Sequence, residues 1–240
     1  MSELRPEAFM NQNEREHEFY ATEDRRNDPK ENFKMISHIL ETGGKHWNSL
    51  CDVGCASGDL LHYIRKQFGK EKTLVGIDSF EKLLHVAQER VPDCKFLKGD
   101  ILSGEGLPKE RFDIVCMLGV LSLLDDFRRP FENLLRLVAP GGSALVFSPF
   151  NSYGCHVEHR YSIRSGEAGR LMIYSQEEIG AWLHGKGYKY EFIPFQLTVK
   201  LDSDPTNPLR SYTVALADGT NGIVNNIGLW FDQYLLRISA

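Results

Sequence analysis

The feature that most constrains this chain is a regular alternation of short apolar segments with amphipathic segments between residues 49 and 148. The apolar segments contain little polar alternation, as is typical of strands buried on both faces, and the segments between them have helical spacing. This alternation predicts an α/β domain in which helices cover both faces of a doubly wound, mostly parallel sheet. Strands are expected at Ser49–Val53, Thr73–Ile77, Lys95–Lys98, Phe112–Met117 and Ser143–Ser148, and helices at Asp59–Phe68, Glu81–Arg90 and Phe127–Val138.

The chain outside this core is less regular. Residues 1–48 are polar and charge-dense, residues 150–174 are polar and irregular, and residues 197–228 carry turn signals. No internal repeat or low-complexity linker separates these parts. We therefore expect a single domain over residues 1–240, made of an N-terminal helical cap, a core at residues 49–149 and the two later segments as insertions.

Several elements are expected in these outer parts. The apolar spacing of residues 33–40 predicts a short amphipathic helix. Gln176–Gly185 is predicted to be a second helix, because Ser175 can act as its N-cap and Glu178 stands where a capping box needs an acidic side chain. Strands are expected at Tyr188–Pro194 and Tyr234–Ser239, the last of which would close the sheet.

Composition narrows the class of protein. The net charge of −5 argues against broad binding to nucleic acid or to an anionic membrane. No apolar run approaches the ~18 residues that span a bilayer, and the N-terminus lacks the apolar core of a signal peptide, so a cytoplasmic location is expected. An odd number of cysteines without a Cys-x-x-Cys pair predicts reduced, buried thiols and no metal site. These cysteines are Cys51, Cys55, Cys94, Cys116 and Cys155.

The turn after the first expected strand is the main functional signal. Its small residues Gly54, Ala56 and Gly58 let the backbone approach a ligand closely, and the helix that follows offers unpaired N–H groups. A glycine turn between a strand and a helix also serves packing alone. The turn therefore needs support from other residues.

Two carboxylates supply that support. Asp78 ends the second strand about 20 residues past the turn, where a carboxylate can accept both ribose hydroxyls of an adenosine. Asp100 follows the third strand, where it can meet the adenine amino group. Each has a plainer interpretation, since Asp78 can cap the next helix and Asp100 can be a turn residue beside Gly99.

A nicotinamide-dependent dehydrogenase would share the strand, the turn and the acidic residue. Its fingerprint is Gly-x-Gly-x-x-Gly, and here Asp59 occupies the place of the third glycine. That carboxylate would repel the pyrophosphate of a dinucleotide. The spacing therefore disfavours a nicotinamide cofactor.

With these motifs the chain resembles the class I S-adenosylmethionine-dependent methyltransferase superfamily. Asp52–Gly58 is similar to its first motif, with Ala56 where glycine is more usual, and Asp78 and Asp100 match its two acidic positions. Val138–Gly142 is similar to the loop that leads into its fifth strand. The resemblance implies a Rossmann-like, seven-stranded sheet whose last strand is antiparallel, and a cofactor, S-adenosylmethionine, lying across the strand ends.

The resemblance also implies which residues bind the cofactor. The glycine turn would line its methionine and ribose portions, the two acidic positions would hold the ribose and the adenine edge, and an aromatic residue, Tyr20 or Phe19, would cover it. The candidate cofactor-binding residues are Asp52, Gly54, Ala56, Gly58, Asp78, Ser79, Asp100, Ile101, Leu118 and Tyr20.

Methyl transfer needs mainly alignment of the acceptor and exclusion of water, because the sulfonium donor is already activated. A hydroxyl acceptor also gains ~10²–10⁴-fold from a general base. Residues 150–174 are expected to overhang the cleft, and His156, His159 and Tyr153 are the candidate catalytic residues there. A solvated surface loop explains them too. Arginines of the same stretch can bind an anionic acceptor.

The acceptor is expected to be a small molecule. The fourth strand lacks the Asp of metal-dependent catechol-type enzymes and the Asn/Asp-Pro-Pro-Tyr of nucleic-acid amino methyltransferases, so no nucleic-acid partner and no metal are expected. The tail around Pro208–Thr213 and Gly228–Phe231 resembles methyltransferases that modify bacterial surface polysaccharides and their nucleotide-linked precursors. It could form an acceptor-binding hairpin or the interface of a homodimer, and Trp230 can equally fill the core.

These observations predict O-methylation of a small polar acceptor, preferably a sugar, a nucleotide-linked or a phosphorylated metabolite. On this interpretation residues 150–174 and 197–228 are acceptor-side insertions. Two alternatives stay open. One is N-methylation of a small amine or a protein side chain, and the other is a protein that binds the cofactor without catalysis.

Overall fold

The computed structural model describes residues 20–44, 46–162, 168–204 and 210–239. Its main sheet follows the strand order β3-β2-β1-β4-β5-β11-β8. Strands β1 to β5 run parallel, and β11 lies antiparallel to both of its neighbours, β5 and β8. The strands are β1 Ser49–Val53, β2 Thr73–Asp78, β3 Lys95–Lys98, β4 Phe112–Leu118, β5 Val138–Asn151, β8 Lys189–Phe195 and β11 Gln233–Ser239. The predicted mostly parallel sheet with an antiparallel last strand is confirmed, but two further strands off this path bring the sheet to nine strands.

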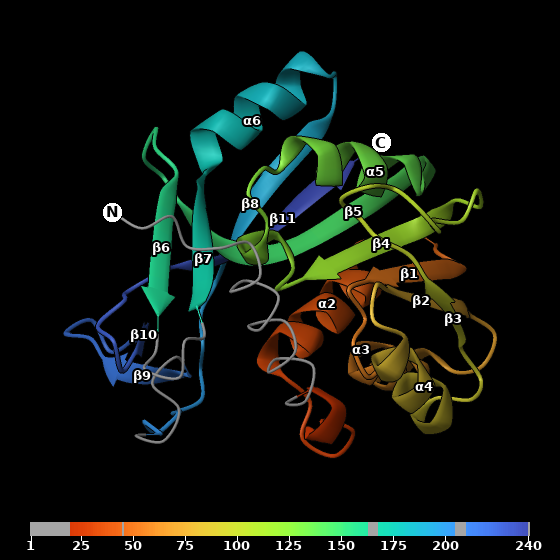
Figure 1. Ribbon diagram of the computed structural model, residues 1–240, viewed down its shortest axis with the longest axis horizontal. Coiled ribbons are helices and arrows are strands. Elements are labelled where there is room, and N and C mark those ends of the chain that lie inside the picture. Colours follow the sequence, from red (N-terminus) through yellow and green to blue (C-terminus); the bar gives the residue numbers. More distant parts are fainter. Residues whose placement is uncertain (1–19, 45, 163–167, 205–209, 240) are drawn as a thin grey trace.

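Helices cover both faces of this sheet, as Figure 1 shows. Helices α2, α3 and α4 lie on one side and α5 and α6 on the other. Among them, α3, α4 and α6 have the predicted bounds, whereas α2 extends the prediction at both ends. The helices are α2 Glu31–Thr42, α3 Asp59–Phe68, α4 Glu81–Arg90, α5 Arg128–Arg136 and α6 Gln176–Gly185, with a short 3-10 helix η1 at Leu121–Leu123.

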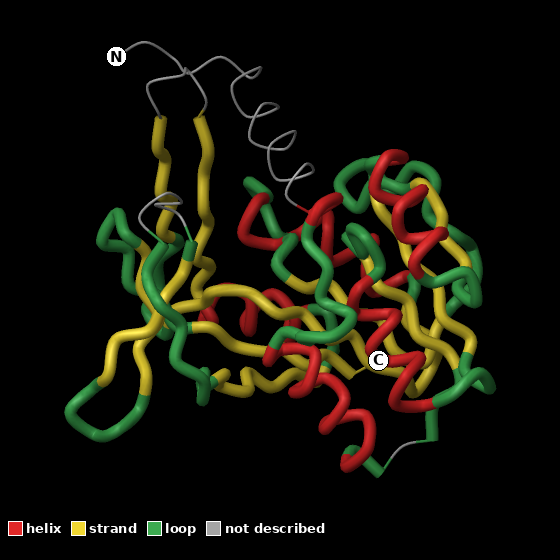
Figure 2. Tube along the Cα trace, turned by 90° about the horizontal axis from the view of Figure 1, so that it is seen from below, coloured by secondary structure: helices red, strands yellow, loops and turns green. Residues whose placement is uncertain are grey.

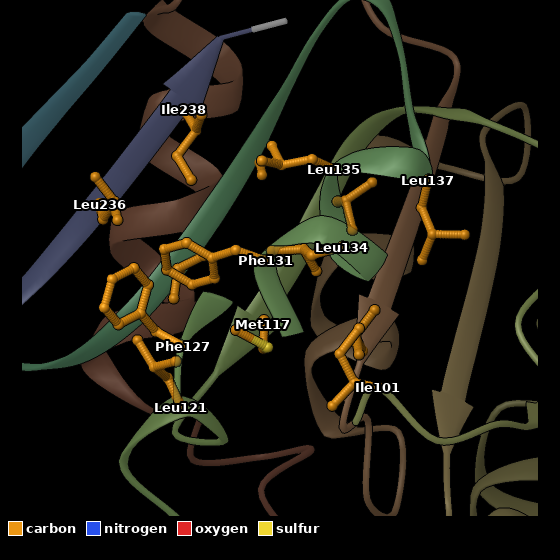
Figure 3. Close-up of a cluster of buried hydrophobic side chains, with 14 of the residues drawn as sticks. Ile101, Met117, Leu121, Phe127, Phe131, Leu134, Leu135, Leu137, Leu236 and Ile238 are labelled. Carbon is orange, nitrogen blue, oxygen red and sulfur yellow. The ribbon is translucent and has the colours of Figure 1, made fainter. Parts of the chain in front are cut away.

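Alternate residues of the buried strands face the two helical layers. In β1, Cys51 and Val53 belong to the cluster under α5 and α6, whereas Leu50 belongs to the cluster under α2 and α3. Figure 3 shows Phe127 and Phe131 of the first cluster beside Met117 of β4. Because both faces are covered, most positions of these strands are apolar, and this is why the sequence shows little polar alternation there.

The largest departure from the prediction lies after β5. Residues 150–174 were expected to be irregular, but they contain β6 Val157–Ser162 and β7 Ala168–Ser175, which pair antiparallel. Figure 2 shows this pair extending away from the rest of the domain. Strand β7 joins the main sheet through Phe150 and Asn151 of β5. The prediction was wrong because β6 is largely exposed and carries polar side chains, so apolar periodicity does not mark it.

A second hairpin lies in the tail, where the sequence had indicated turns and a hairpin as one possibility. Strands β9 Ser211–Ala215 and β10 Asn221–Asn225 form a separate two-stranded antiparallel sheet within the stretch expected to be turns. A small apolar cluster packs this hairpin against β7. Its residues are Ile173, Leu197, Ile223, Leu229 and Phe231.

The boundary between α5 and β5 also differs from the prediction. The helix was expected to reach Val138, but β5 already begins there. The pairing of β5 with β4 shifts between Val138 and Ser143, so the Pro140-Gly141-Gly142 segment lies in an irregular part of the strand. No helix among the described residues is both long and apolar enough to cross a membrane. Of the five cysteines Cys155 is exposed and the others are buried.

Candidate active site

The carboxyl ends of β1, β2, β3 and β4 meet at one edge of the sheet, and a cavity of about 540 Å³ lies there. The segments that follow these strands form its wall, at residues 52–57, 78–80, 99–102 and 118–120. Such a position is where α/β sheets usually bind their ligands. All of the predicted cofactor residues except Gly58 line this cavity, namely Asp52, Gly54, Ala56, Asp78, Ser79, Asp100, Ile101, Leu118 and Tyr20.

The turn after β1 is hydrogen-bonded to the neighbouring strand β2. The backbone N–H groups of Gly54 and Cys55 both donate to the carbonyl of Ile77, at 2.8 and 3.1 Å. Gly54 has φ +76°, and a side chain there would collide with Val120. Ala56 has φ +45° and is the one non-glycine residue with positive φ in the described part of the chain. The turn therefore holds a backbone shape that favours glycine at both positions.

Gly58 has a different role from the predicted one. It is the N-cap of α3 with φ +81°, and a Cβ at this position would lie 3.1 Å from the Phe96 ring and 3.3 Å from Ala87. Its missing side chain lets α3 pack closely against α4 and β3. Gly58 thus shapes the turn without lining the cavity.

Asp78 connects two walls of the cavity. Its carboxylate accepts hydrogen bonds from the backbone N–H of Ala56 at 2.9 Å and of Phe80 at 3.0 Å. Burial raises the pKa of Asp78 even though these bonds stabilise the charged form. The carboxylate is thus fixed in place and retains lone pairs for a further donor, which suits a ligand with hydroxyl groups.

Asp52 is a second buried carboxylate on the same wall. It is 4% exposed, and burial together with the charge of Asp78 raises its pKa from 3.8 to about 7. Two carboxylates in a region of low dielectric make this part of the cavity favourable for a positively charged ligand.

The opposite end of this wall is more apolar. Ile101, Leu102 and Phe80 line it beside Asp100. Both oxygens of Asp100 accept backbone N–H groups, from Leu102 at 2.9 Å and from Ser103 at 3.2 Å. Although burial disfavours the charge, these bonds hold the pKa of Asp100 below its usual value. Asp100 therefore keeps its predicted place and also orders its own turn.

The N-terminal segment closes one side of the cavity. Tyr20 lines it, and the Lys30 ammonium lies 5.1 Å from the centre of the Tyr20 ring. Arg90 of α4 fastens this segment by donating to the carbonyls of Glu23 and Ala21 at 2.7 and 3.0 Å. Phe19, the other predicted aromatic, lies outside the described residues.

The remaining wall comes from the other side of β4, and we name it the acceptor half. It consists of Leu123 at the end of η1, Leu124 directly after it, Phe147 of β5, Arg170 of β7 and Gln233 of β11. The Arg170 guanidinium forms an ion pair with Asp125 and donates to the Leu123 carbonyl at 3.4 Å. Sequence analysis had not singled out Gln233, Phe147 or the two leucines.

The three predicted catalytic residues do not line the cavity. His156 Nδ1 accepts the Ser175 backbone N–H at 3.0 Å, and His156 Nε2 lies 2.8 Å from the Glu178 carboxylate. Its ring packs between Phe127 and Tyr174, at centroid distances of 5.9 and 5.1 Å. The predicted N-cap of α6 is confirmed, because Ser175 Oγ accepts the Glu178 backbone N–H at 3.2 Å.

The imidazole of His156 thus stands where the side chain of a capping box would reach back to the N-cap N–H. His159 lies half-buried on β6, and Tyr153 lies in the turn before it with 73% of its surface exposed. The structure therefore separates all three from the cavity, because the segment that carries them is a hairpin and not an overhanging loop.

Comparison with known proteins shows which proteins the central part of the chain resembles. Residues 51–144 match the family described as a methyltransferase domain. The trans-aconitate 2-methyltransferase of Yersinia pestis (strain Pestoides F) is 30% identical over 117 residues, which are 49% of this chain and 43% of that protein. This part of the chain is therefore similar in sequence to S-adenosylmethionine-dependent methyltransferases.

Solved structures agree on the fold of this chain. A chain of the DhpI–SAM–HEP complex matches 98% of it with a TM-score of 0.57 and 14% identity, over 99% of that chain. The sugar N-methyltransferase KedS8 from Streptoalloteichus sp ATCC 53650 matches 70% of it with a TM-score of 0.56 and 17% identity, over 83% of that chain. The sequence match spans less than half the length of the Yersinia protein.

S-adenosylmethionine is the cofactor of class I methyltransferases, and the cavity of this chain fits it. The buried carboxylates Asp52 and Asp78 suit its positive charges and its ribose hydroxyls, and the apolar end at Ile101 and Phe80 suits a purine. The turn at Gly54 and Ala56 carries almost no side chain, so a ligand can reach the backbone.

Proposed function

We propose that this protein is an S-adenosylmethionine-dependent methyltransferase that methylates an oxygen atom of a small polar metabolite. The observation that carries the proposal is a continuous cavity with two chemically different halves. One half has Asp52, Asp78 and Asp100 on its wall, and the acceptor half has Arg170 and Gln233.

In the proposed assignment, each cofactor-facing residue has a defined task. Asp78 holds the ribose hydroxyls, Asp100 and Ile101 border the adenine, and Asp52 faces the positive charge of the methionine portion. Leu118 stands between the two halves of the cavity, and Tyr20 covers the cofactor. When bound, the cofactor supplies an activated methyl group, so the protein needs mainly to align the acceptor and to exclude water.

Calorimetry with S-adenosylhomocysteine tests the cofactor site directly. We expect saturable binding to the full chain and a loss of affinity in Asp78→Ala. Asp113→Ala is a suitable control, because Asp113 does not line the cavity. Its carboxylate accepts hydrogen bonds from the backbone N–H groups of Asn48 and Ser49 at the start of β1. Absence of binding by the unmodified chain would refute the proposed function.

A screen for turnover tests catalysis. The acceptors are trans-aconitate, for which the Yersinia relative is named, together with citrate, glucuronate, glucose, glucose 6-phosphate and ethanolamine. This set samples the sugar and phosphorylated classes favoured by the sequence, and also an amine for the alternative of N-methylation. Release of S-adenosylhomocysteine that depends on an added acceptor distinguishes an enzyme from a protein that only binds the cofactor.

A further inference from the structure

The acceptor half contains no group suited to removing a proton. Among the described residues that line the cavity there is no histidine. The carboxylates on the cavity wall belong to the ends of β1 and β2 or to the segments that follow β1 and β3, and none belongs to the acceptor half; they are Asp52, Asp59, Asp78 and Asp100. Burial also raises the pKa of the Cys55 thiol well above its ordinary value, so it stays protonated.

This absence bears on which oxygen can react. A hydroxyl has to lose its proton during methyl transfer, and enzymes usually supply a base for that step. A carboxylate with an ordinary pKa is already ionised at neutral pH and brings its own lone pairs. It therefore needs alignment but no base.

The positive charge of the acceptor half also favours a carboxylate acceptor. This charge is that of Arg170, and a guanidinium is the side-chain group best shaped to bind a carboxylate. Its nearer ion-pair partner Asp125 has 72% of its side chain exposed, whereas Arg170 has 16%, and a second carboxylate, that of Glu158, lies 3.8 Å from the guanidinium. An ion pair with so exposed a partner contributes little free energy, so an acceptor carboxylate can take the place of Asp125 at low cost.

We propose that the acceptor reacts through a carboxylate that Arg170 binds, and that the product is a methyl ester. The inference rests on the proposed function. One carboxylate oxygen donates a lone pair to the methyl carbon while the carbon–sulfur bond breaks, and its electron pair returns to sulfur. The sulfonium and the carboxylate become a neutral thioether and a neutral ester, and no proton moves.

The first experiment identifies the product. The full chain is incubated with methyl-labelled S-adenosylmethionine and each acceptor of the screen, and the product is then treated with mild alkali. We expect label in products of the carboxylates trans-aconitate, citrate or glucuronate, and its release as methanol, because esters are cleaved under these conditions and methyl ethers and methylamines are not. An alkali-stable product overturns the inference.

The second experiment measures acceptor binding by calorimetry in the presence of S-adenosylhomocysteine, without turnover. Arg170→Gln is expected to raise the Kd of the carboxylate about 10- to 100-fold. Asp125→Asn removes the competing carboxylate and is expected to lower that Kd about two- to fivefold. Opposite effects at these paired residues would not arise if Arg170 only held the hairpin in place.

Arg237→Gln is the matched control. Arg237 of β11 forms an ion pair with Glu191 at 2.6 Å and does not line the cavity, so its loss should leave the Kd unchanged. If none of the carboxylates binds or is methylated, the carboxylate inference is refuted even when S-adenosylhomocysteine binds. If S-adenosylhomocysteine itself does not bind, the proposed function fails. The two failures are thus distinguishable.

Discussion

Asp52→Asn should have opposite effects on stability and on cofactor binding, and both should depend on pH. Burial and the neighbouring charge of Asp78 raise the pKa of Asp52 from 3.8 to about 7. At about 1.4 kcal/mol per unit of pKa, ionising Asp52 in the folded chain destabilises it by at most about 4 kcal/mol. The protonated carboxyl does not carry this penalty.

The direction with pH follows from linkage. The pKa of Asp52 is higher in the folded chain than in the unfolded chain. The contribution of this carboxyl group to the free energy of unfolding is therefore complete below pH ~4 and is lost as the pH rises through about 7. Asparagine resembles the protonated form at every pH. The difference in unfolding free energy between Asp52→Asn and the unmodified chain should therefore be small at pH 4 and approach ~4 kcal/mol in favour of the variant at pH 8.

Denaturant unfolding of both proteins at several pH values measures this difference, and the titrating groups that do not interact with Asp52 cancel in the comparison. Calorimetry measures the effect of the substitution on cofactor binding. Affinity for S-adenosylmethionine should rise with pH through about 7 in the unmodified chain, because a cationic ligand prefers ionised Asp52, and this rise should be absent in Asp52→Asn. A stability difference that stays constant from pH 4 to pH 8 would show that the pKa of Asp52 is not raised.

Three further substitutions test separate parts of the site. Asp78→Ala should weaken cofactor binding by ~1–3 kcal/mol, because charge-assisted hydrogen bonds are lost, and unchanged affinity by calorimetry would refute the ribose contact. Ala56→Gly should raise the unfolding free energy by up to ~1 kcal/mol, because glycine adopts φ +45° without steric cost, and a lower melting temperature would contradict the strain. His156→Ala should lower stability by ~1–3 kcal/mol, because the Ser175 N–H loses its acceptor, while kcat stays within about twofold. A large fall in kcat with unchanged stability would instead restore His156 as a catalytic base.

The sequence predicts an element of this fold only where a local sequence pattern indicates where that element begins and ends. Strand β1 and helices α3, α4 and α6 have the predicted bounds, because apolar runs and helical spacing end there at glycine, proline or a capping serine. The hairpin β6–β7 has no such marks. Its strands are held by their pairing with each other, and only the end of β7 reaches the main sheet, so polar side chains are tolerated along most of β6.

The same reasoning explains why the two halves of the cavity differ in predictability. On the cofactor side most of the wall lies at the end of a strand or directly after it, so a few consecutive residues such as Gly54–Ala56 place the ligand by local geometry. The acceptor half brings together Phe147, Arg170 and Gln233 from three strands that are distant in the sequence, and β11 reaches its place only by inserting between β5 and β8. No local sequence pattern indicates that β11 inserts there. The choice of acceptor is therefore a property of the assembled sheet, which is why sequence analysis favoured histidines on the hairpin while the structure turns Arg170 toward the cavity.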